Sequence, residues 1–93
     1  MSDQLINLTL TEKQLSTIVS GLLFSCSVNV VSNTNEEYAR DLFDLAKLIK
    51  SAMPELKLED VQFLKEENYE DSISQEVLSE FGSNMTILSF EEV

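Results

Sequence analysis

Residues 11–31 read TEKQLSTIVSGLLFSCSVNVV, and they carry no charged side chain after Lys13. Thr11 and Gln14 match a capping box, in which each side chain accepts a hydrogen bond from the backbone amide of the other residue. This pattern predicts a helix from about Glu12 to about Val31. Residues 24–31 also alternate and are rich in β-branched side chains, so a strand is the alternative there. Apolar residues recur at the spacing of one helix face: Leu15, Ile18, Val19, Leu22, Cys26 and Val30.

A second helix is predicted after a short polar loop at residues 32–35. Thr34 and Glu37 form another capping-box pattern, and a broad apolar face follows them. Pro54 disfavours helical backbone at the residue before it. We therefore expect this helix to end at about Ala52.

A third, shorter helix is predicted near the C-terminus. Ser72 and Gln75 form a further capping-box pattern, and Gly82 stands where a left-handed glycine commonly ends a helix. Residues 55–65 fit either a short helix or an extended strand. The acidic run at residues 66–71 is expected to be a loop.

Two segments alternate apolar and polar side chains, as half-buried strands do: residues 5–10 and residues 85–90. A two-stranded sheet is marginal unless it packs against helices, which this chain supplies. We therefore expect these N- and C-terminal strands to pair in a small sheet beside a helical hairpin and a short third helix. The predicted fold class is α+β, mostly helical, in a single domain spanning residues 1–93.

The residue types that most enzymes and metal sites need are scarce. The chain has no His and one cysteine, Cys26, which is expected to be a small core residue. Zinc, copper and haem sites rely on His and Cys ligands, and a Ser–His or Cys–His pair cannot be assembled. There is also no Gly-rich phosphate loop. We expect no catalysis, no cofactor and no bound metal.

The uncharged run from residue 14 to residue 35 has the length of a membrane span. Its polar side chains are too numerous for a lipid-facing helix. We therefore expect a soluble, cytoplasmic protein with no membrane contact. The polar residues in question are Ser16, Thr17, Ser20, Ser25, Ser27 and Asn29.

The negative charge is concentrated in the C-terminal part. The chain carries −11 overall, and residues 55–93 hold eleven acidic and two basic residues, a net charge of −9. Such a chain repels nucleic acid and suits a basic partner protein, although a charged surface can also serve solubility alone. The residues expected to bind the partner are Glu66, Glu67, Glu70, Asp71, Glu76 and Glu80.

The leading functional hypothesis is a non-catalytic acidic interaction protein. In its sharpest form the carboxylates take the places of phosphates, and the protein is a nucleic-acid mimic that inhibits a DNA- or RNA-binding protein. Glu76 and Glu80 have the four-residue spacing that puts two helical side chains side by side. Short acidic chains with a strand-helix-helix opening resemble phage-borne accessory and inhibitor proteins in style, without a shared motif.

The first predicted helix suggests a second surface. Its side away from the core is apolar and uncharged, which predicts a homodimer through this helix. The alternative function is thus a structural or assembly subunit that acts through an apolar interface between copies. The residues expected at that interface are Leu22, Leu23, Phe24, Val28 and Val31.

Overall fold

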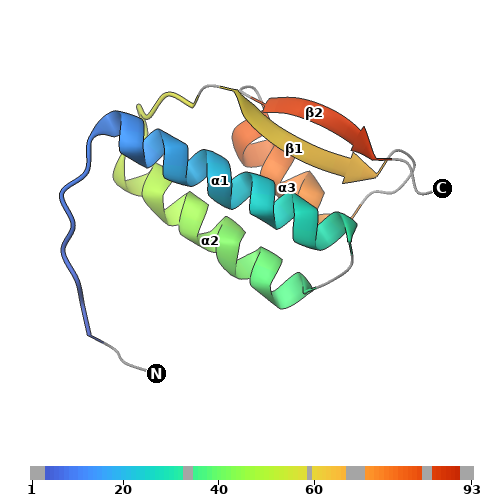
Figure 1. Ribbon diagram of the computed structural model, residues 1–93, viewed down its shortest axis with the longest axis horizontal. Coiled ribbons are helices and arrows are strands. Elements are labelled where there is room, and N and C mark those ends of the chain that lie inside the picture. The colour runs from blue at the N-terminus through green and yellow to red at the C-terminus, as the bar shows by residue number, and fades with distance from the viewer. Residues whose placement is uncertain (1–3, 33–34, 59, 67–70, 83–84, 91–93) are drawn as a thin grey trace.

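The computed structural model describes residues 4–32, 35–58, 60–66, 71–82 and 85–90. The elements are α1 (Glu12–Val31), α2 (Glu36–Ala52), β1 (Val61–Glu66), α3 (Ser72–Phe81) and β2 (Met85–Phe90). Helices α1 and α2 lie side by side as a hairpin, and β1 lies between α1 and β2 (Figure 1). The mostly helical α+β class is confirmed, and so are the expected bounds of α1 and the end of α2. The alternative strand at residues 24–31 is wrong, because this segment completes α1.

The sheet differs from the expected pairing of terminal strands. β1 and β2 pair in parallel, from Val61 opposite Met85 to Glu66 opposite Phe90, and α3 connects them. The strand expected at residues 85–90 is confirmed, whereas residues 5–10 form neither helix nor strand. Residues 5–10 have the alternation of a strand, but they are not the partner of β2. That partner is β1, which lies in the segment after Pro54 that the sequence left as either helix or strand.

The helix starts follow the sequence signals to within one residue. At α1 the capping box is confirmed: the Thr11 amide donates to Gln14 Oε1 at 2.9 Å, and the Gln14 amide donates to Thr11 Oγ1 at 3.1 Å. At α2 the cap is Asn35, whose Oδ1 accepts from the Tyr38 amide. Thr34, the expected cap, lies outside the described residues.

The expected end of α3 before Gly82 is confirmed, but the expected cap Ser72 and the left-handed conformation expected of Gly82 are wrong. Asp71, one residue before Ser72, caps the helix, because its Oδ1 accepts from the Ser74 amide at 2.6 Å. Asp is as strong an N-cap as Ser, and its charge also suits the positive end of the helix. Gly82 is helical, with φ −58° and ψ −27°, so it is not a left-handed terminator.

This geometry predicts unequal effects of two neighbouring substitutions. Asp71→Ala should lower the free energy of unfolding by about 1 kcal/mol, because it leaves an amide in the first turn of α3 without its acceptor. Ser72→Ala should change it by less than about 0.5 kcal/mol. Urea denaturation followed by circular dichroism measures both values, and a larger loss for Ser72→Ala would restore Ser72 as the cap.

The core lies between the three helices and the inner face of β1. Val61 and Phe63 point inward from β1 and are fully buried. Phe43 and Phe81 meet edge to face in the centre, with ring centroids 6.4 Å apart. The remaining buried apolar residues are Val19, Leu23, Cys26, Ala39, Leu42, Ala46, Ile73 and Val77.

Candidate functional site

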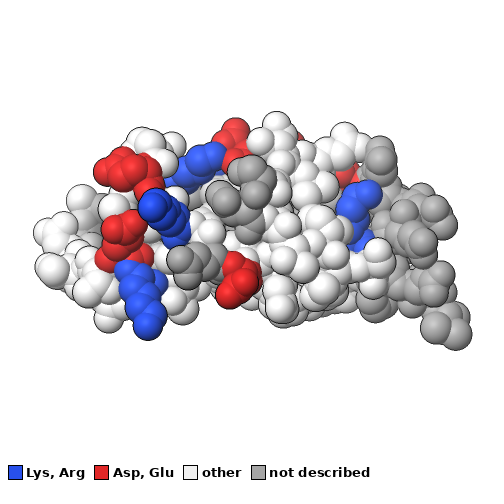
Figure 2. All heavy atoms as spheres, turned by 90° about the horizontal axis from the view of Figure 1, so that it is seen from above, with Lys and Arg blue, Asp and Glu red and all other residues white. Residues whose placement is uncertain are grey.

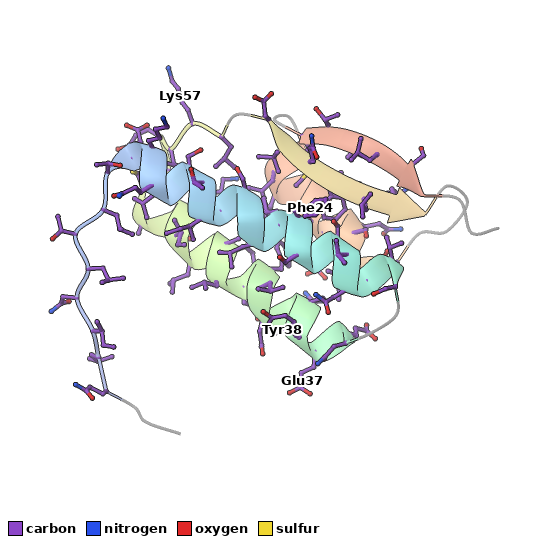
Figure 3. All side chains as sticks on the ribbon, viewed as in Figure 1. Phe24, Glu37, Tyr38 and Lys57 are labelled. Atoms are coloured by element: carbon purple, nitrogen blue, oxygen red, sulfur yellow. The ribbon has the colours of Figure 1, made fainter. Side chains whose placement is uncertain are left out.

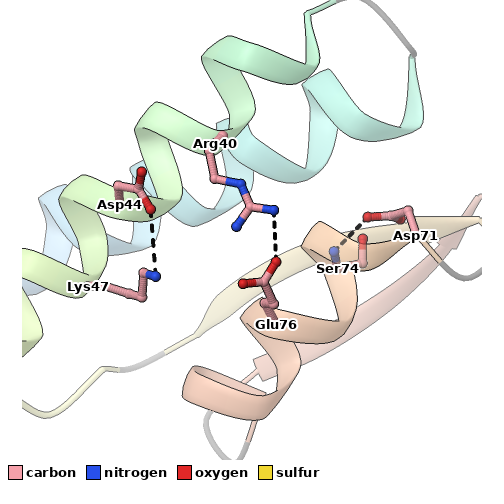
Figure 4. Close-up of polar contacts among 6 residues, drawn as sticks. All are labelled: Arg40, Asp44, Lys47, Asp71, Ser74 and Glu76. Atoms are coloured by element: carbon pink, nitrogen blue, oxygen red, sulfur yellow. Dashed lines mark hydrogen bonds and ion pairs between the residues drawn. The ribbon is translucent and has the colours of Figure 1, made fainter.

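Two of the predicted acidic residues lie at the contact between α2 and α3. Glu76 Oε2 lies 2.8 Å from Arg40 Nη2, and Glu80 Oε2 lies 3.6 Å from Lys50 Nζ (the first pair in Figure 4). The hydrogen bond from Arg40 lowers the pKa of Glu76 and raises that of the guanidinium. These pairs link the two helices, so Glu76 and Glu80 are not the free anionic pair that their spacing suggested.

The other predicted acidic residues do not form a described cluster. Asp71 is half-buried and occupied as the cap of α3 (Figure 4). Glu66 ends β1, so its backbone is strand rather than loop. The Glu66 side chain, Glu67 and Glu70 lie outside the described residues.

A different acidic group is free on α2. Glu36, Glu37 and Asp41 are exposed, and no ion pair joins them to another described residue. Glu37 extends away from the body of the molecule (Figure 3). The four-residue spacing of Glu37 and Asp41 is visible in the sequence, but only the packing of α2 shows that these acids face outward.

The uncharged side of α1 is partly core and partly surface. The prediction that Leu23 lies at an interface between copies is wrong, because Leu23 is fully buried in the core. Leu22 and Val31 are half-buried, while Phe24 and Val28 are 38% and 37% exposed. The α1 face, as we call the exposed strip, consists of Thr17, Ile18, Gly21, Phe24 and Val28.

Three members of this face, Thr17, Ile18 and Gly21, were not among the predicted interface residues. Ile18 is 39% exposed. A Cβ added at Gly21 would meet no other atom within 4 Å, so the surface is open above it. The three- and four-residue spacing from Ile18 through Gly21 to Val28 is the sequence signal that links them.

The N-terminal arm, residues 4–11, is a further apolar surface. It leaves the start of α1 as an extended segment that points away from the rest of the molecule (Figure 1). Leu5, Ile6 and Leu8 are 94%, 75% and 76% exposed. Leu10 lines a shallow hollow together with Lys13, Gln14, Thr17 and Ile18 of α1. The arm and the α1 face are therefore neighbouring surfaces.

Helix α1 is long and apolar enough to cross a membrane by length and composition alone. Core helices of soluble proteins pass the same test. In this fold α1 contributes Val19, Leu23 and Cys26 to the core and packs against α2 and β1. One side of α1 thus packs in the core, and the opposite side carries the exposed α1 face.

The described residues offer little for chemistry. No three potential metal ligands come together among them. Burial, followed by the Asp71 carboxylate, raises the pKa of the Cys26 thiol to about 11, so this thiol stays protonated at neutral pH. A hollow between α2 and α3 contains Lys50 and Glu80, which pair with each other. The exposed apolar surfaces are therefore the strongest candidate for function.

No family model, curated protein or solved structure matches this chain at a significant level.

Proposed function

We propose that this chain is a non-catalytic assembly subunit, and that copies of it associate through the α1 face. One observation carries the proposal: residues 14–35 contain no charge in a chain of −11, yet Ile18, Phe24 and Val28 are each more than a third exposed. An uncharged apolar strip on a strongly charged surface favours contact with another apolar surface. A cytoplasmic location agrees with the packing of α1 against α2 and β1.

Charge explains why this strip is the suitable contact between copies. Two chains of −11 repel each other, and the repulsion is weakest where neither copy presents a carboxylate. The α1 face meets that condition, because Lys13 is the last charge before Glu36. The absence of a side chain at Gly21 also lets another surface approach the helix closely.

Sedimentation equilibrium tests the proposal. We expect the wild-type protein to dimerise at tens of micromolar, and the double variant Phe24→Ser, Val28→Ser to dimerise about tenfold more weakly or worse, because two apolar contacts are lost. Tyr38→Ser is the matched control, since Tyr38 is an exposed side chain on α2 (Figure 3). Raising the salt concentration should strengthen or preserve the dimer. A monomeric wild-type protein at these concentrations overturns the proposal.

A second candidate function is binding of a basic partner protein, and the free acids of α2 favour it. Glu37 and Asp41 are exposed without an ion pair to the described residues, whereas Glu76 and Glu80 are paired. If this function holds, a basic protein captured from lysate should be lost when the salt concentration rises. Glu37→Lys, Asp41→Lys should abolish capture, and Phe24→Ser, Val28→Ser should leave it unchanged. Capture that survives high salt would speak against it.

A further inference from the structure

The N-terminal arm has the pattern of a strand, but no described strand pairs with it. Residues 5–10 make no hydrogen bond to the described part of the chain. Their backbone is therefore free to pair. Ile6, Leu8 and Leu10 would lie on one side of such a strand, and Asn7 and Thr9 on the other.

The sheet has an unprotected edge of the same length. β2 pairs with β1 on one side, and no described strand lies on its other side. Edge strands usually carry lysine, proline or a covering segment that blocks pairing with another chain. β2, residues MTILSF, has neither a charge nor a proline. Its Ile87 lies on the same face as Phe63 and is 42% exposed, so the inner face of the sheet is not covered at this edge.

The surroundings of this edge also suit an uncharged strand. Seen from the side on which the sheet lies, charged side chains gather mainly at one end, and a broad neighbouring stretch is uncharged (Figure 2). Neither the arm nor β2 has a charge, whereas β1 ends in Lys65 and Glu66. An added strand at β2 therefore meets no carboxylate from the edge itself.

We propose that the N-terminal arm of one copy adds as a strand to the free edge of β2 in a second copy. Six residues of the arm match the six residues of β2. A second copy is the natural donor because the arm leaves the molecule at the end away from β2 (Figure 1). Reciprocal exchange gives a closed symmetric dimer, in which Ile6 and Leu8 cover Ile87. The inference rests on the proposed homo-oligomeric function and assigns the segment that links the copies.

Matched substitutions in the arm test the inference by sedimentation equilibrium. The double variant Ile6→Ser, Leu8→Ser should raise the dissociation constant of the dimer about tenfold or more, because arm exchange buries the side chains of Ile6 and Leu8 against the second copy. Asn7→Ser, Thr9→Ser changes the opposite side of the same segment and should shift it less than about threefold. On the receiving edge, Ile87→Lys should weaken the dimer as much as the arm variant, since a lysine protects edge strands.

Disulfide trapping tests which segments meet. Asn7→Cys and Thr86→Cys are made as separate proteins, and a third protein carries Leu88→Cys. Asn7→Cys mixed with either β2 variant under mild oxidation should give a mixed cross-linked dimer. Wild-type protein should give none with Asn7→Cys, because its one thiol, Cys26, is buried. Ser51→Cys, at an exposed position on α2, should also give none, because this position lies outside the proposed contact.

The outcomes separate this inference from the proposed function. A wild-type dimer that loses stability with the α1-face variant, but not with the arm variant, overturns arm exchange and leaves the α1 contact standing. Cross-linking of Asn7→Cys only with itself shows two arms paired with each other and also overturns arm exchange. A dimer with no mixed cross-link at either β2 position does the same. A monomeric wild-type protein overturns both.

Discussion

Phe43→Ala should lower the free energy of unfolding by about 3–5 kcal/mol, the largest effect expected of any single substitution here. Phe43 is fully buried, and its ring meets Phe81 edge to face across the α2–α3 contact. The ammonium of Lys47 also lies 4.6 Å from the ring centroid. Truncation leaves a cavity between the helices and removes the aromatic pair.

Denaturation by urea, with circular dichroism as the signal, measures this loss. A domain of this size has a stability on the order of 5–10 kcal/mol, so Phe43→Ala removes a large part of it and shortens the folded baseline of the urea curve. Phe43→Leu is the second variant, and it should lose less than half as much because it fills most of the cavity. Phe24→Ala, at a partly exposed position on α1, serves as the control. A loss below about 1 kcal/mol for Phe43→Ala would contradict the core described above.

Stability should also fall as the pH rises from 9 to 11, because of Cys26. Burial raises the pKa of its thiol from an ordinary value of 9.0 to about 11 in the folded protein. Between these values the unfolded chain has lost the thiol proton while the folded chain keeps it, so rising pH favours unfolding. Below pH 9 the thiol is protonated in both states, and the stability is unaffected. By pH 11 the ionisation of the thiol in the unfolded chain has lowered the free energy of unfolding by about 2 kcal/mol.

Comparison with Cys26→Ala isolates this effect. The substitution costs some stability at every pH, because it removes a buried side chain. Other groups that titrate in this range are common to both proteins, so the difference between the two stability curves reports the thiol alone. We expect this difference to shrink from pH 9 to pH 11. Parallel curves would show that the thiol ionises as easily in the folded protein as in the unfolded chain.

The helices could be predicted from the sequence because their signals are local. A capping side chain acts on an amide two or three residues away, and the apolar repeat is complete within two turns. Thr11 and Gln14 were enough for the start of α1, whereas its end at Val31 was predicted with a strand at residues 24–31 as the alternative. The cap of α3 was missed by one residue, because Asp71 and Ser72 are both good caps and only the backbone shows which one is used.

The candidate surfaces were predicted only in part. Phe24 and Val28 were placed correctly at the surface of α1, but Leu23 belongs to the core. On a helix that is apolar on all sides, the sequence does not show which strip the other elements cover. The same holds for the acids: the spacing of Glu76 and Glu80 is local, whereas their pairing with Arg40 and Lys50 depends on how α3 packs on α2.

The sequence alone was sufficient for the α+β class, the three helices and the last strand. Strand pairing required the fold, because residues 5–10 and residues 61–66 are both plausible partners for β2, and a strand is stabilised by residues far away in the chain. The α3 crossover brings β1 beside β2, and packing against α1 buries Val61 and Phe63. Residues 5–10 keep the pattern of a strand, but among the described residues no hydrogen-bonding strand edge lies beside them.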